Sequence, residues 1–134
     1  MEIERDFIKR EIQKINLILI GLLAKVTGAD GNHSNIGIDD LNETFKEMFD
    51  LSLTEFIETE ESELEKKLTT INHSHLDKII DLFFEIIQRK EIDGLELGFE
   101  STMISKRTIF LIDYLDRTSK TFSIKRMDIK NRLG

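Results

Sequence analysis

The feature that most constrains the fold is a long apolar pattern over residues 5–27. Apolar side chains recur there three and four residues apart, which places them on one face of an α-helix. They are Ile8, Ile12, Ile15, Leu19, Leu22 and Val26. Leu17, Ile18, Ile20 and Leu23 widen this stripe until the second half is apolar nearly all round, as in a helix that partners surround. We therefore predict a helix that is central in the fold or that pairs with a second copy.

The composition of the remaining chain favours further helices. The 134 residues include no Pro and only seven Gly, so few positions must interrupt a helix. A chain of this length fits one domain, and we predict a single all-α domain over residues 1–134. The chain has no Cys, which excludes disulfides, thiolate metal sites and cysteine nucleophiles.

Helix-start signals and apolar periodicity predict five or six helices packed as antiparallel hairpins in an irregular helical bundle. Residues that can cap a helix occur at Asp39 or Asp40, Ser52, Thr59, Ser74, Ser101 and Ser123. Ser52 and Glu55 have the spacing of a capping box, and Phe122 and Met127 that of a hydrophobic staple. Residues 76–87 are strongly apolar and predict a second core helix. Residues 28–37, GADGNHSNIG, predict a loop.

Three segments resemble a family of short bacterial proteins known only as a domain of unknown function. They are DFIKREIQKI at 6–15, DLSLTEFI at 50–57 and IDYLDRTSKTFSIKRMDIKNRL at 112–133. The resemblance implies helical hairpins of the tetratricopeptide type and brings no catalytic residues. The chain departs from that type because it has no Trp and no Pro. A concave peptide-binding groove therefore does not follow from the resemblance.

Residues that could carry chemistry have simpler structural explanations. His73 and His75 lie two residues apart, with Asp77 and Asp81 at helical spacing from His73, but a metal site would need both histidines to converge with a carboxylate from elsewhere. They lie beside a predicted cap, where surface residues are the simpler explanation. The acidic pairs Asp39–Asp40 and Glu60–Glu61 fall in first turns of predicted helices, where the helix dipole favours them. No phosphate-binding loop or nucleophile motif occurs. We expect no catalysis, no metal and no cofactor.

The C-terminal segment is the strongest candidate for a binding site. Residues 101–134 carry a net charge of +5, whereas residues 1–100 carry −12. The candidate anion- or partner-binding residues are Lys106, Arg107, Arg117, Lys120, Lys125, Arg126, Lys130 and Arg132. If they converge, they could hold phosphates. The pairs Asp113–Arg117 and Asp116–Lys120 could instead neutralise them within one helix, and the acidic chain as a whole repels a polyanion.

These patterns lead to one functional prediction and one alternative. We predict a non-catalytic protein-interaction or structural module that binds a protein partner, or itself, through the apolar N-terminal helix. The alternative is a nucleic-acid or anion binder that uses the basic C-terminal helices. The apolar run over residues 15–26 is shorter than the roughly 20 residues of a membrane span, and the first residues have no positive bias of a signal peptide. We therefore expect a cytoplasmic protein with no membrane segment.

Overall fold

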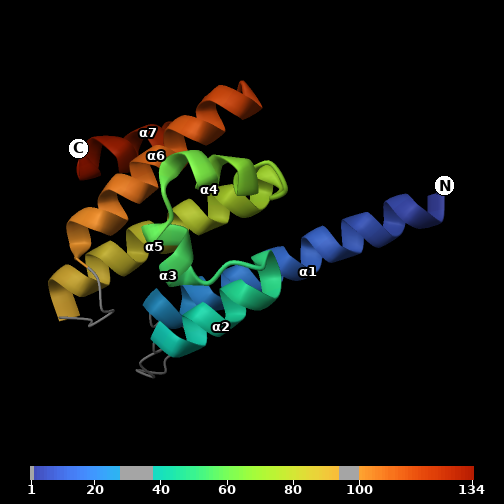
Figure 1. Cartoon of the computed structure of the whole chain (residues 1–134), viewed down its shortest axis with the longest axis horizontal. Coiled ribbons are helices and arrows are strands. Elements are labelled where there is room, and N and C mark those ends of the chain that lie inside the picture. The colour runs from blue at the N-terminus through green and yellow to red at the C-terminus, as the bar shows by residue number, and fades with distance from the viewer. Residues whose placement is uncertain (1, 28–37, 94–99) are drawn as a thin grey trace.

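The computed structural model describes residues 2–27, 38–93 and 100–134, and these ranges are almost entirely helical (Figure 1). The helices are α1 (Glu2–Thr27), α2 (Ile38–Phe49), α3 (Leu53–Glu58), α4 (Glu61–Leu68), α5 (His73–Asp93), α6 (Ser101–Ser119) and α7 (Ile124–Leu133). The predicted all-α class is confirmed. The described ranges contain seven helices where five or six were predicted, and extended backbone at Thr59 and Glu60 separates α3 from α4. The loop predicted over 28–37 lies outside the described residues.

The helix at the centre of the described structure is α5. It packs against α1 on one side and α6 on the other, and these are the two largest helix contacts in the fold. Its buried residues are Leu76, Ile79, Ile80, Leu82, Phe83, Ile86 and Ile87. Figure 1 shows α5 between α1 and the pair formed by α6 and α7. The prediction of a second core helix over residues 76–87 is confirmed, and this helix is central.

The prediction that other helices surround α1 is wrong for its first half. Figure 1 shows this half extending away from the other helices. Leu19, Leu22 and Val26 are buried, whereas Ile8, on the same face, is 57% exposed. The periodic pattern identified the face that turns inward, but α5 covers that face only along the second half of α1. The first half continues past the end of the covering helix.

An aromatic cluster joins α2, α3 and α5 in the interior. The rings of Phe45 and Phe56 meet edge to face with their centroids 6.0 Å apart, and those of Phe56 and Phe83 do so at 5.8 Å. Phe45 and Phe83 are stacked at 6.3 Å. Such ring pairs contribute about 0.5–1.5 kcal/mol each beyond the burial of apolar area. The cluster therefore fixes the short helix α3 against α5.

The predicted helix starts are confirmed in part. The Oγ of Ser52 accepts from the amide of Glu55, and the Glu55 carboxylate accepts from the amide of Ser52, which completes the capping box and lowers the pKa of Glu55. Ser123 caps α7 as predicted. Thr59 does not cap α4, because it closes the end of α3. Asn72, and not Ser74 as predicted, caps the start of α5: its Oδ1 accepts a hydrogen bond from the amide of Ser74 at 2.9 Å.

The hydrophobic staple predicted at Phe122 and Met127 is wrong, because both side chains are exposed. In the parts of the chain that the structure describes, no helix is both long enough and apolar enough to span a bilayer.

Candidate interaction surface

The largest uncovered apolar side chains of the described chain are concentrated on α1 and around the start of α7. On α1 the exposed fractions are 63% for Phe7, 57% for Ile8, 68% for Leu17 and 49% for Ile20. Around the start of α7 they are Phe122, Ile124 and Met127. Single exposed apolar residues are common, but several on one helix indicate an interaction surface.

Leu17 and Ile20 belong to a side of α1 that we call the outer face. It consists of Arg10, Gln13, Lys14, Leu17, Ile20 and Gly21, all of which are exposed. A rotation of 100° per residue places these six residues opposite the line of Leu19, Leu22 and Val26 that α5 covers. α1 therefore has two apolar lines, and the fold buries only one of them.

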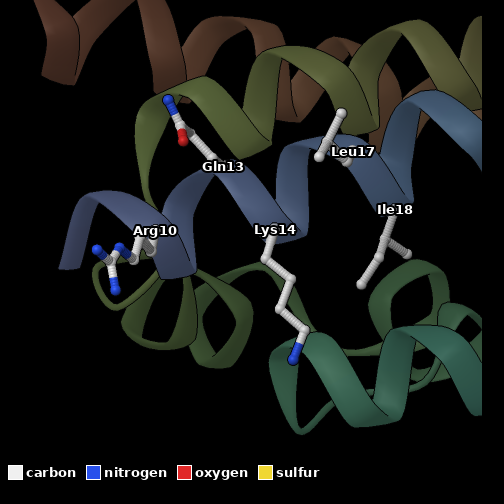
Figure 2. Close-up of a pocket in the computed structure, with 5 residues that line it drawn as sticks. All are labelled: Arg10, Gln13, Lys14, Leu17 and Ile18. Atoms are coloured by element: carbon white, nitrogen blue, oxygen red, sulfur yellow. The ribbon is translucent and has the colours of Figure 1, made fainter. Parts of the chain in front are cut away.

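A shallow hollow of about 450 Å³ lies along the outer face. It is lined by Arg10, Gln13, Lys14, Leu17 and Ile18. Figure 2 shows Gln13 and Leu17 pointing to one side of α1, and Lys14 and Ile18 pointing to the other side, toward α2. The hollow combines apolar side chains with two cations, a composition suited to a partner that is amphipathic and acidic.

Contacts from α5 hold α1 in place beside this surface. Nε2 of His75 donates to the carbonyl oxygen of Ile12 at 3.0 Å, and the Asn16 amide donates to Oγ of Ser74 at 3.5 Å. Arg89 also donates to the carbonyl oxygen of Thr27. Burial lowers the pKa of His75, and the hydrogen bond to Ile12 partly opposes this effect. These bonds anchor α1 from Ile12 to Thr27.

Five of the eight basic C-terminal residues form ion pairs, four of them with acidic residues of other helices and one within its own helix. Arg117 pairs with Glu65 at 2.6 Å, Lys125 with Asp81 at 2.9 Å, Lys130 with Asp113 at 2.6 Å, and Arg132 with Asp128 at 3.2 Å. The contact with Asp113 raises the pKa of Lys130. The predicted pairs Asp113–Arg117 and Asp116–Lys120 do not form, because α7 folds back on α6 and brings Lys130 and Arg126 to those carboxylates.

Arg126 links three helices. Its guanidinium donates to Asp77 of α5 at 2.8 Å, to Asp116 of α6 at 2.7 Å, and to the carbonyl oxygen of Thr121 at 2.9 Å. Burial alone would lower the pKa of Arg126, but the two carboxylates outweigh it and raise that pKa. A guanidinium with this many partners is part of the fold and is not presented to a ligand.

Arg107 is buried between α3 and α6. Its guanidinium donates to the carbonyl oxygens of Ile57 and Thr59 at the end of α3, where a cation suits the helix dipole. Burial lowers the pKa of Arg107, and the nearby Glu61 opposes this effect. Of the eight candidate cations, only Lys106 and Lys120 form no ion pair or hydrogen bond with a described residue. The structure therefore does not bring the eight residues together as one open cationic face.

The two histidines of the possible metal site lie in different environments. His75 is buried beneath α1, whereas His73 is exposed and its Nε2 lies 3.4 Å from Oγ1 of Thr118. Among the described residues, no three His, Cys, Asp or Glu side chains gather closely enough to hold a metal ion.

Sequence reasoning missed the outer face as a separate surface. All the apolar residues of α1 were treated as one broad buried stripe, although Leu17 and Ile20 point away from Leu19 and Leu22. The available signal was spacing: Arg10, Gln13, Leu17, Ile20 and Ala24 alternate three and four residues apart. That alternation is the heptad spacing of helices that pair along a seam.

No protein family, curated protein or solved structure matches this chain. The resemblance to a short bacterial family therefore stays a prediction.

Proposed function

We propose that this chain is a non-catalytic protein-interaction module that docks a protein partner on the outer face of α1. The observation that carries the proposal is the exposure of Leu17 and Ile20 on a helix whose opposite face is firmly packed. Leaving a large apolar side chain in water forgoes about 1.5–3 kcal/mol of burial energy. A partner that covers both residues would recover this energy.

The length and position of α1 support the same proposal. Most of its first half extends away from the other helices (Figure 1). An isolated helical segment of about 12 residues is marginal in water, because most helix stability in proteins comes from packing an amphipathic face. A bound partner would supply this missing support.

The alternative function, anion or nucleic-acid binding by the C-terminal helices, is less well supported. Phosphate binding depends on several cations that can release counterions together. Here five of the eight cations are ion-paired and Arg107 is bonded to backbone carbonyls. A mobility-shift assay at low salt, with single-stranded and double-stranded nucleic acid, tests this alternative directly, and a salt-sensitive shift would favour it.

Site-specific photocrosslinking in extract of the source cell tests the proposed function. One form carries benzoylphenylalanine at Leu17, and the control form carries it at Ile124, which is 74% exposed on α7. We expect a discrete crosslinked protein band from position 17 and none from position 124. Equal labelling from both positions, or no band from either, would contradict docking on the outer face.

Three further predictions accompany this proposal. We propose a cytoplasmic location, a bacterial origin as the resemblance implies, and hairpin packing of the tetratricopeptide type. The contact between α6 and α7, which are consecutive in the chain, supports the hairpin packing.

A further inference from the structure

The outer face of α1 has a geometry suited to a second helix. Leu17, Ile20 and Ala24 lie on one line at alternating spacings of three and four residues, and Leu17 and Ile20 are its most exposed members. This spacing keeps side chains in register with a partner helix that crosses at a shallow angle. The line is short, so the contact it makes is local.

Gly21 adds an independent observation beside this line. A Cβ placed on Gly21 would meet nothing within 4 Å, so nothing inside the described chain requires a bare backbone there. Glycine within a helix costs roughly 1 kcal/mol relative to alanine. A bare backbone allows another helix to approach closely, and this site lies next to Leu17 and Ile20 on the outer face.

The distribution of charge favours a second copy over an unrelated partner. The cations Arg10 and Lys14 lie toward the projecting end of the outer face and form no ion pair with a described residue. Near the opposite end of α1, α2 exposes Asp39, Asp40 and Glu43, which also form no ion pair within the described ranges. Figure 1 shows α2 running beside the second half of α1. A surface with cations at one end and acids at the other complements itself when two copies are antiparallel.

We infer that two copies of this chain associate through antiparallel α1 helices whose crossing lies between Leu17 and Ile20, next to Gly21, with Leu17 of one copy opposite Ile20 of the other. This inference rests on the proposed function, because it names the partner of the same surface. In this register Arg10 lies beside the end of the partner's α1, and the cations Arg10 and Lys14 approach the acidic start of its α2. A two-fold arrangement makes each of these contacts twice.

The first test is the mass of the full chain in solution, measured by sedimentation from about 1 to about 100 µM, a range that brackets the Kd on the order of 10 µM expected for a small interface. We expect the mass to rise with concentration from 15.6 kDa toward twice that value. A chain that stays monomeric over this range overturns the inference. If it stays monomeric and position 17 still crosslinks a different protein, the proposed function stands without the dimer.

Three variants separate a specific interface from loss of folding. Leu17→Lys changes an exposed residue and should weaken association at least tenfold. Gly21→Leu adds bulk next to the crossing while favouring the helix, so it should abolish association with unchanged or increased helicity by circular dichroism. The matched control Ile124→Lys, at an exposed apolar residue elsewhere, should associate like the unchanged chain. Association that survives Leu17→Lys or Gly21→Leu overturns the inference.

Disulfide trapping tests the orientation, and the absence of Cys makes the chain suitable. Mixing Leu17→Cys with Ile20→Cys should give a mixed disulfide faster than either variant crosslinks with itself. Predominant self-crosslinking of Leu17→Cys indicates parallel helices and overturns the antiparallel arrangement.

Discussion

Arg126 of α7 donates through Nε to Oδ1 of Asp116 in α6 at 2.7 Å, and through its other nitrogens it also holds α5 and the turn before α7. The Arg126 side chain is 6% exposed, whereas its two acidic partners are about half exposed. This single guanidinium therefore joins the C-terminal helix to the central helix, and its removal should loosen α7.

Arg126→Met should lower the free energy of unfolding by about 2 kcal/mol, because it removes charge-assisted bonds but leaves the partner carboxylates in contact with water. Arg132→Met is the matched control, since its pair with Asp128 is exposed and should be worth less than about 0.5 kcal/mol. Urea unfolding measures the free energy of unfolding of both variants. Equal losses of stability in the two would show that burial of Arg126 contributes nothing.

His75 should make stability depend on pH. Burial lowers its pKa in the folded chain, so below the ordinary pKa of about 6.5 the unfolded chain binds more protons than the folded chain. Stability should therefore be constant above that pH and fall as the pH drops through it, by at most about 1.4 kcal/mol per pH unit. Urea unfolding from pH 8 to pH 5 measures this loss.

Two variants assign that dependence to the imidazole. His75→Gln removes the titrating group and should reduce the loss of stability on acidification. Phe49→Leu alters the ring packed 6.2 Å from His75 but keeps the imidazole, so it should lower stability while the pH dependence remains. A His75→Gln variant with undiminished pH dependence would assign the effect to other groups.

Lys120→Gly and Lys106→Gly should have opposite effects. Lys120 ends α6 with a φ of 55° in the left-handed region, which glycine adopts without strain. The substitution should raise stability by about 0.5 kcal/mol, after allowance for the extra freedom of glycine in the unfolded chain. Lys106 lies within α6, so glycine there should cost about 1 kcal/mol. Thermal unfolding followed by circular dichroism compares the two, and a loss at both positions would contradict the strain at Lys120.

Phe83→Ala should be among the most damaging single changes. The side chain is fully buried in α5 and contacts Phe45 and Phe56, so its truncation leaves a cavity and costs about 3–5 kcal/mol. Phe122→Ala removes a ring that is 72% exposed and should change stability by less than about 0.5 kcal/mol. Chemical denaturation distinguishes these outcomes. A small effect at Phe83 would contradict the central position of α5.

The candidate site on α1 could be predicted from the sequence only in part. Apolar spacing identified the covered side of α1 from Leu19 to Val26, and it identified the N-terminal helix as the element for association, which remains a proposal. It did not separate Leu17 and Ile20 from the buried line. The spacing of apolar residues defines a face of a helix. The exposure of that face depends on where the neighbouring helix ends.

By itself the sequence determined an all-helical chain, an apolar helix over residues 76–87, and the caps at Ser52 and Ser123, because these depend on spacings of three or four residues within one helix. Only the tertiary structure decided that α5 is central, that α1 projects beyond it, and that the basic C-terminal side chains meet acids on other helices. Those outcomes depend on the order in which helices pack and on where long charged side chains reach, and no local pattern of residues specifies either.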